Sequence, residues 1–121
     1  MAVTEIVYNK AKRSLTLTFD DAFVAELSAE FLRVYSPLEQ TSVKGKPKPP
    51  VSNKKLVAIS AIDNVAKHGL RIQFDDQHQA VYRQVLLHEY AHNQHRLWQE
   101  YIDALAVTGY TREANIEIKQ L

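Results

Sequence analysis

Two stretches of the chain, LTLTFDD at residues 15–21 and LRIQFDD at residues 70–76, share an apolar alternation that ends in the same Phe-Asp-Asp. Alternation with a period of two is typical of a half-buried β-strand, and paired aspartates favour a turn directly after it. When residues 15–35 are aligned with residues 70–90, seven of the twenty-one pairs are identical. We therefore interpret the chain as a duplication in which each copy reads strand, aspartate turn, strand and short helix.

The segments around the two copies predict the remaining elements of the domain. Residues 4–8 and 56–62 carry apolar and β-branched side chains and predict two further strands. Ser28 is expected to cap the first short helix, and Pro37 is expected to end it. The predicted fold class is therefore α+β, with antiparallel strands from the two hairpin–helix repeats and a C-terminal helix packed on the sheet.

The last third of the sequence has the pattern of a second, separate helix. Apolar residues recur there with helical spacing, Gly109 favours the end of the helix, and Asn93 is the candidate residue to cap its start. A helix that begins at Asn93 requires a bend near Ala91. We expect one domain over residues 1–112, followed by a disordered tail over residues 113–121.

The composition excludes several classes of protein. The chain has 121 residues, of which 45% are hydrophobic and 24% are charged, and its net charge is +1. This is typical of a globular domain and indicates no overall preference for nucleic acid. The absence of cysteine excludes disulfides, a thiolate nucleophile and sulfur ligands to a metal. Since we find neither a signal-peptide core nor a run of about 18 apolar residues, we expect a cytoplasmic protein without a membrane span.

The pentapeptide HEYAH at residues 88–92 is the strongest candidate for chemistry. On one continuous helix this motif places His88 and His92 on the same face as zinc ligands, with Glu89 as the base of a hydrolase. The expected bend would separate the two imidazoles, and no well-placed residue supplies the third protein ligand that a catalytic zinc needs. We therefore interpret these histidines, with His95, as solvated residues at a helix junction. No catalytic residue, metal or cofactor is predicted, and a zinc-dependent hydrolase remains the alternative.

The segment over residues 39–55 reads as a loop that is rich in proline and lysine. Its lysines are Lys44, Lys46, Lys48, Lys54 and Lys55. Such a group can contact phosphate, which makes a nucleic-acid binder a further alternative. However, no aromatic residue lies among the lysines to stack on bases, so nucleic acid is not the expected partner.

One family shares these features over nearly the whole chain. The segment LSAEFLRVYSP at residues 27–37, together with the two repeated strands, resembles the gamma-butyrobetaine hydroxylase-like N-terminal domain. In bacteria this domain also occurs as a small stand-alone protein of unknown function. The resemblance includes TEI at residues 4–6, HGLRI at residues 68–72 and LWQEYI at residues 97–102, and it extends over about residues 3–112.

The resemblance implies an accessory or interaction module rather than an enzyme. Relatives occur fused to oxygenase domains and to iron–sulfur-cluster carrier ATPases, whereas the iron and 2-oxoglutarate ligands of the hydroxylase belong to a separate catalytic domain. The expected partner is therefore another protein, of unknown identity. The candidate contact residues are Arg33, Tyr35, Asp76 and His78, beside the two turns and the lysine-rich loop.

The resemblance does not imply a zinc site in this chain. In the eukaryotic hydroxylases the domain holds a structural zinc through three cysteines and one histidine. His78 stands at the histidine position, but the cysteine positions are occupied by Ser36, Leu38 and Thr41. Three of the four ligands are thus replaced by residues that do not bind zinc in this way.

Glycines common in the family are also replaced. Family members commonly carry glycine after the acidic turn residue, where this chain has Ala22 and Gln77. We therefore expect the two hairpin turns to close differently. A family glycine near the position of Ala91 further supports the expected break in the helix.

Overall fold

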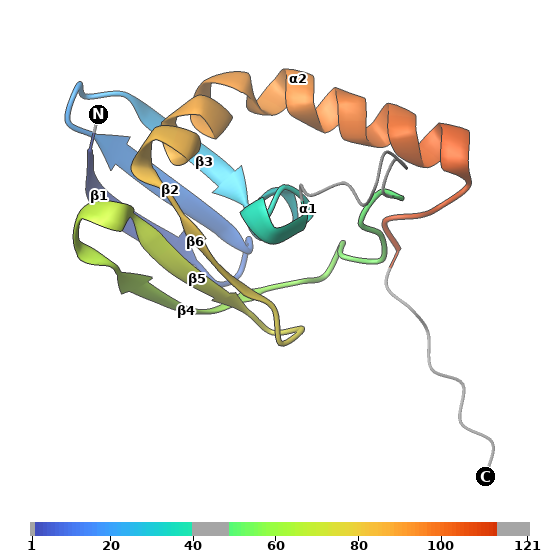
Figure 1. The fold of residues 1–121 in the computed structure, drawn as a ribbon, viewed down its shortest axis with the longest axis horizontal. Helices are drawn as coiled ribbons and strands as arrows, with labels where there is room; N and C mark the ends of the chain where they lie inside the picture. Colours follow the sequence, from blue (N-terminus) through green and yellow to red (C-terminus); the bar gives the residue numbers. More distant parts are fainter. Residues whose placement is uncertain (1, 40–48, 114–121) are drawn as a thin grey trace, which may run out of the picture.

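The computed structural model describes residues 2–39 and 49–113, which form two three-stranded antiparallel sheets, a short helix and a long helix (Figure 1). The strand orders are β1–β2–β3 and β4–β5–β6. The strands span Val3–Asn9, Ser14–Phe19, Val24–Ser28, Ile59–Asn64, Leu70–Phe74 and Gln79–Tyr82. The helices are α1 (Ala29–Val34) and α2 (Gln84–Thr108), with 3-10 turns η1 (Pro37–Glu39) and η2 (Ala66–His68). The predicted α+β class is confirmed.

The two sheets repeat one another in detail. Each is a meander of three strands followed by a helix, and all pairing is antiparallel. The first strand of each sheet shifts register near its start, between Val3 and Glu5 in β1 and between Ile59 and Ala61 in β4. Shared strand order, direction and irregularity confirm the duplication predicted from the repeated Phe-Asp-Asp.

The core lies where the two sheets and the helices meet. In both copies the apolar residues of the repeated strand are buried, as the alternation predicts. These buried residues are Leu15, Leu17 and Phe19 in β2 and Leu70, Ile72 and Phe74 in β5. Helix α2 packs against β3 and adds Leu87, Tyr90 and Ala91 to the same core. Because each sheet has one apolar face, each copy completes the burial of the other.

The two aspartate turns have the same conformation. A side-chain oxygen of Asp21 accepts a hydrogen bond from the backbone N–H of Phe23 at 3.0 Å, and Asp76 does the same for the N–H of His78 at 3.2 Å. In each turn the residue between the aspartate and its N–H donor has a positive φ, 68° at Ala22 and 72° at Gln77. This is the left-handed region that glycine favours, so the turns keep that geometry without glycine, contrary to the expectation that they close differently.

The first helix begins and ends as predicted, but the second does not. The Ser28 hydroxyl accepts from the N–H of Phe31 at 3.0 Å and so caps α1. Helix α2 is unbroken over 25 residues, so the expected bend near Ala91 is wrong. Asn93 lies inside α2, where its side chain donates to the carbonyl of Glu89 at 3.0 Å instead of capping a new helix.

The repeat itself explains the different helix lengths. Proline cannot donate a backbone hydrogen bond, and Pro37 follows α1 closely. The residue fifty-five positions later is His92, which continues the helix. Gly109, with φ of 78°, ends α2 as predicted, and its N–H donates to the carbonyl of Leu105 at 2.9 Å. None of the described helices is long and apolar enough to cross a membrane.

The segment that follows α2 is attached to the rest of the domain. The carbonyls of Thr111 and Arg112 accept hydrogen bonds from the N–H groups of Asn53 and Lys55, at 2.8 and 3.0 Å. The Arg112 guanidinium also forms a bidentate pair with the buried Glu30 carboxylate, with both N–O distances at 2.8 Å. Of the tail predicted over residues 113–121, all but the first residue lie outside the described part of the chain.

A glycine at the left-handed turn position is expected to stabilise the fold. The variant Gln77→Gly removes the cost of about 1–2 kcal/mol for a side chain in that conformation, while glycine adds about 0.4–1 kcal/mol of unfolded-state entropy. We expect the free energy of unfolding in urea to rise by about 0.5–1 kcal/mol. The control is Gln79→Gly in strand β6, which should lower it by about 0.5–1 kcal/mol. Equal losses in both variants would contradict the assigned turn conformation.

Candidate functional site

A partly buried carboxylate collects the polar groups of three segments. Asp76, on the β5–β6 turn, accepts from Arg33 Nε at 2.7 Å and from Lys54 Nζ at 2.6 Å, both through Oδ2. Its Oδ1 accepts from the N–H of His78, whose ring lies beside Ser36. We call these five residues the Asp76 cluster. It joins α1 and the segment after it to the second hairpin.

The hydrogen bonds of the Asp76 cluster favour the ionised form of the Asp76 carboxyl. Burial alone would raise the pKa of the Asp76 carboxyl, but hydrogen bonds from Lys54, Arg33 and the N–H of His78 outweigh burial and lower the pKa to about 2. Arg33 is only 8% exposed, and its Nη1 lies 3.8 Å from Glu39 Oε1. A buried guanidinium needs such anionic partners, so Asp76 holds α1 in place as much as it holds its own turn.

A serine and a histidine meet next to this carboxylate. His78 Nε2 lies 2.7 Å from Ser36 Oγ, and the N–H of Leu38 donates to the same oxygen at 3.3 Å. Burial, followed by the charge of Arg33, lowers the pKa of His78, so its ring is uncharged at neutral pH. The positions that the resemblance assigns to a zinc histidine and one zinc cysteine are therefore adjacent here, but they form a hydrogen bond. Thr41, at another cysteine position, lies outside the described residues.

The Ser36–His78 pair does not form a catalytic triad with the neighbouring aspartate. Ser36 has no solvent-exposed surface, so a substrate carbonyl cannot reach its hydroxyl. Asp76 accepts from the backbone N–H of His78, whereas a triad needs the aspartate on the ring Nδ1. The pair is thus arranged to support structure rather than nucleophilic attack.

Three of the four predicted contact residues come together, and the fourth lies apart. Arg33, Asp76 and His78 belong to the Asp76 cluster, whereas Tyr35 faces helix α2. The Tyr35 hydroxyl donates to the carbonyl of Leu97 at 2.6 Å, and its ring packs between aromatic neighbours of the core. Sequence reasoning missed Lys54 and Ser36 as members, although the lysine-rich run was a signal for Lys54.

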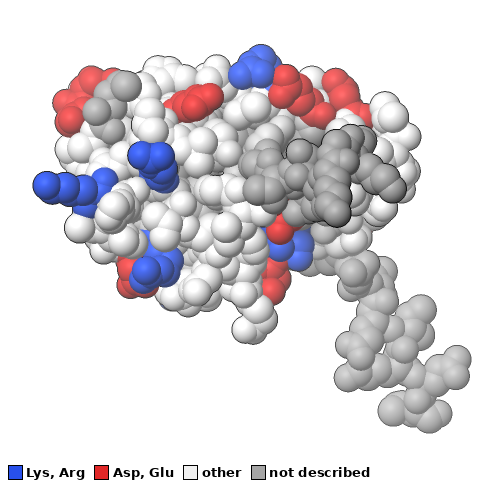
Figure 2. Space-filling model, viewed as in Figure 1, with Lys and Arg blue, Asp and Glu red and all other residues white. Residues whose placement is uncertain are grey.

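The lysine-rich loop is only partly described. Lys54 pairs with Asp76 and Lys55 pairs with Glu113 at 3.0 Å, while the three earlier lysines of the loop lie outside the described residues. Figure 2 shows basic and acidic residues scattered over one face of the molecule. The two lysines that can be placed are therefore occupied by carboxylates and do not add support to the nucleic-acid alternative.

The duplication places a second aspartate contact at the equivalent point of the other copy. The residues fifty-five positions from Asp76 and Arg33 are Asp21 and His88. Asp21 Oδ2 lies 3.3 Å from His88 Nε2, just as Asp76 Oδ2 contacts Arg33. The helix of each copy therefore reaches the aspartate turn of the other copy. This reciprocal contact was not predicted, although the aligned repeat contained all four residues.

The unbroken helix changes the reading of the HEYAH motif. His88 and His92 lie one turn apart on α2, and their Nε2 atoms are 3.2 Å apart, so the imidazoles converge instead of separating. Glu89 is exposed, and so is His95. Among residues 2–39 and 49–113, no three His, Cys, Asp or Glu side chains are already arranged to hold a metal ion. The described residues thus lack the third ligand in place that a catalytic zinc requires.

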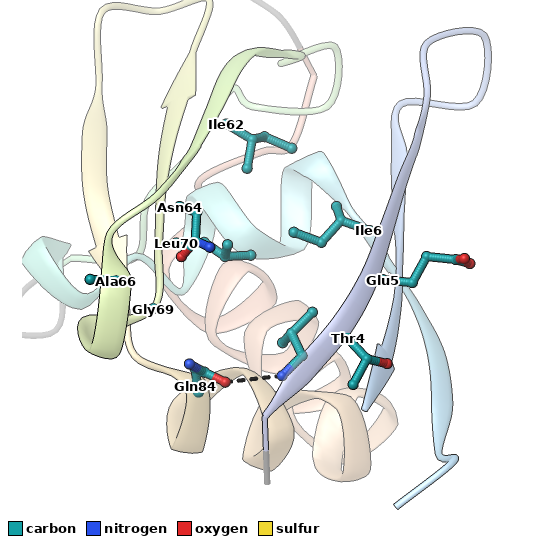
Figure 3. Close-up of a pocket in the computed structure, with 10 residues that line it drawn as sticks. Thr4, Glu5, Ile6, Ile62, Asn64, Ala66, Gly69, Leu70 and Gln84 are labelled. Carbon is teal, nitrogen blue, oxygen red and sulfur yellow. Dashed lines mark hydrogen bonds between the residues drawn. The ribbon is translucent and has the colours of Figure 1, made fainter. Parts of the chain in front are cut away.

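A cavity of about 360 Å³ lies at the seam between the two copies, between β1 and the β4–β5 pair (Figure 3). Ile6 faces Ile62 and Leu70 across it. Gln84 of α2 closes one end, where its side-chain oxygen accepts from the N–H of Val3 at 3.0 Å. Among the described residues that line it, Glu5 alone is ionisable. The cavity therefore suits an apolar group better than acid–base chemistry.

Comparison with known proteins identifies a matching family. Residues 6–88 match the family described as gamma-butyrobetaine hydroxylase-like, N-terminal. The chain is similar to two proteins solved by solution NMR. One is 30% identical with a TM-score of 0.78, over 99% of this chain and 96% of that chain. The other is 34% identical with a TM-score of 0.77, over 99% and 91%.

A third structure shows the fold alone. It is the crystal structure of a protein of unknown function from Acidithiobacillus ferrooxidans ATCC 23270, which belongs to the DUF971 family. That protein is 22% identical with a TM-score of 0.58, over 70% of this chain and 86% of its own. A search of curated proteins finds no match.

The Asp76 cluster is expected to lose its stabilising effect in acid. A carboxyl with a lower pKa in the folded than in the unfolded chain stabilises above the unfolded pKa, and it loses this contribution as the pH falls through the folded pKa. For Asp76 these values are 3.8 and about 2. Near pH 6, Asp76→Asn should lower the free energy of unfolding by about 1–3 kcal/mol.

The difference between wild type and Asp76→Asn should shrink as the pH falls from about 4 to about 2. Urea unfolding of both proteins across this range measures it. The exposed Asp20 of the first turn provides the control, because Asp20→Asn should change stability little at any pH. A constant difference for Asp76→Asn down to pH 2 would contradict the lowered pKa.

Proposed function

The chain belongs to the gamma-butyrobetaine hydroxylase-like, N-terminal family, and from this premise we propose that it is a non-catalytic domain that binds another protein at the Asp76 cluster. The observation that carries the proposal is the construction of this cluster. Arg33 and Lys54 pair with Asp76 where the two copies meet, and this contact is partly exposed. Ser36, the hydroxyl nucleophile of the cluster, is completely buried. Such a site suits recognition better than a reaction.

Preorganisation of the polar groups supports a binding role. The side chains of Lys54 and Asp76 keep about a fifth of their surface in solvent, and each is already fixed by an ion pair. Polar groups that are oriented before binding lose little conformational freedom when a partner arrives. The neighbouring Arg33 and Glu39 make the local charge nearly balanced, so we infer a partner surface with polar groups of both signs.

An exposed apolar residue lies directly beside these charges. Leu38 is 61% exposed, and its backbone N–H is bound to Ser36 of the cluster. An apolar anchor that adjoins a polar group is the usual composition of a protein interface, with a buried centre and a hydrogen-bonded rim. We propose that Leu38 is the apolar anchor of the contact.

The resemblance of the sequence supports the cellular setting of this proposal. Because relatives of the domain occur beside oxygenase domains and iron–sulfur carrier ATPases, we propose that the chain acts in the cytoplasm as an accessory to such a protein. The zinc-dependent hydrolase remains the alternative to this reading. It would need a third ligand to join His88 and His92 and a substrate placed against Glu89.

Photo-cross-linking in the native cell tests the proposed surface. A benzophenone side chain at position 38 should cross-link a single partner, whereas the same group at position 107 should not. Val107 is the matched control because it is apolar, 86% exposed and near the far end of α2. With the purified partner, Leu38→Asp should weaken binding at least about tenfold, as expected for an interface anchor, and Val107→Asp should not.

Two outcomes would contradict the proposal. One is a partner that cross-links equally from positions 38 and 107. The other is a partner whose affinity is unchanged by Leu38→Asp and by Asp76→Asn, while circular dichroism shows that both variants are folded.

A further inference from the structure

The two histidines of the HEYAH motif are in direct contact through their Nε2 atoms. Their Nε2 atoms are 3.2 Å apart, so without a metal one ring N–H must donate a hydrogen bond to the other ring nitrogen. Two nitrogen ligands that each lie about 2.0–2.1 Å from a tetrahedral metal ion are themselves about 3.3 Å apart. The observed separation therefore fits a single ion in place of the shared proton.

A carboxylate oxygen is available as a third ligand. Asp21 Oδ2 lies 3.3 Å from His88 Nε2, which again is the distance between two ligands of one ion. The other oxygen of Asp21 is held by the N–H of Phe23 at 3.0 Å. A ligand carboxylate that is itself hydrogen-bonded is typical of metal sites.

Aromatic rings fix the orientation of both imidazoles. The Phe23 ring stacks on His92, with ring centres 4.0 Å apart and an interplanar angle of 7°. The ring of Phe19 meets His88 edge to face, at 4.9 Å and 87°. His88 is 12% exposed at its side chain and Asp21 is 44% exposed, so the site has one packed wall and one open side. The open side leaves room for water to complete the coordination.

We propose that His88, His92 and Asp21 form a binding site for one divalent transition-metal ion. Because no three such side chains of the described residues are already arranged around one point, the site must close when the ion binds. In this closure the Asp21 carboxylate would turn its Oδ2 atom towards the ion, while Oδ1 keeps its hydrogen bond to the N–H of Phe23. A donor set of two imidazoles and one carboxylate selects zinc, copper, nickel or cobalt over magnesium and calcium.

The duplication indicates what such an ion does for the fold. In one direction, Arg33 of the first copy bridges to Asp76 of the second. In the other direction the equivalent pair is His88 and Asp21, in which an imidazole takes the place of the guanidinium. A bound cation would supply a fixed positive charge at this point. The site is independent of the proposed protein contact, which lies at the Asp76 cluster.

Metal titration of the full chain, prepared without a histidine tag, tests the inference. Zinc binding measured by calorimetry should give one ion per chain, and cobalt should give the visible absorption of a four-coordinate ion. His92→Ala should abolish both signals, and Asp21→Asn should weaken the affinity by about 10- to 100-fold. His95→Ala is the matched control, since His95 is exposed on the same helix and should change neither signal.

Three results would overturn the proposal. The first is no binding of zinc or cobalt by the folded wild-type chain. The second is binding that His95→Ala reduces as much as His92→Ala does, which would indicate non-specific histidine binding. The third is an affinity that does not change in Asp21→Asn. Circular dichroism of each variant ensures that a lost signal reflects a lost ligand and not an unfolded chain.

Discussion

The contact between Arg33 and Asp76 joins helix α1 of the first copy to the aspartate turn of the second copy. A guanidinium that is almost fully buried must have an anion beside it, because an unpaired charge costs several kcal/mol in such a place. The nearer of its two anionic neighbours lies on a turn of the other copy, so the second hairpin stabilises the burial of Arg33 in α1. The same carboxylate receives Lys54 and the N–H of His78. One side chain thus contacts a helix, its own turn and the segment around Lys54.

The duplication explains why this contact exists and why its counterpart differs. A three-stranded meander with one apolar face cannot bury that face alone, so the two copies cover each other, and each helix meets the other copy's aspartate turn. Divergence then changed the two junctions. Pro37 ended one helix after six residues, whereas His92 allowed the other to continue for 25. The longer helix supplies two convergent imidazoles where the shorter one supplies a guanidinium.

Much of the fold could be predicted from local patterns, because the burial of residues alternates along β3, β5 and β6 and along β2 from Leu15 onward. Ser28, Pro37 and Gly109 also act as caps and stops through their own chemistry, so the ends that they determine were correct. The predicted bend near Ala91 was wrong because a residue that can cap a helix, such as Asn93, can also lie inside one. Inside a helix that is buried along one side, tertiary packing decided the outcome.

The candidate site could be predicted only in part for a related reason. Arg33, Asp76 and His78 were predicted because they lie beside the two turns and the lysine-rich loop, while Lys54 and Ser36 join them through contacts between distant segments. No local pattern reports such a contact. The convergence of His88 and His92 likewise depended on knowing that the helix continues.

A double-mutant cycle on Arg33 and Asp76 tests the central claim most directly. The unfolding free energies of wild type, Arg33→Met, Asp76→Asn and the double variant give the coupling between the two side chains. If this pair joins the two copies, the coupling energy should be about 1.5–3 kcal/mol, as for a charged hydrogen bond that is shielded from solvent. A coupling below about 0.5 kcal/mol, with all four proteins folded, would contradict the account.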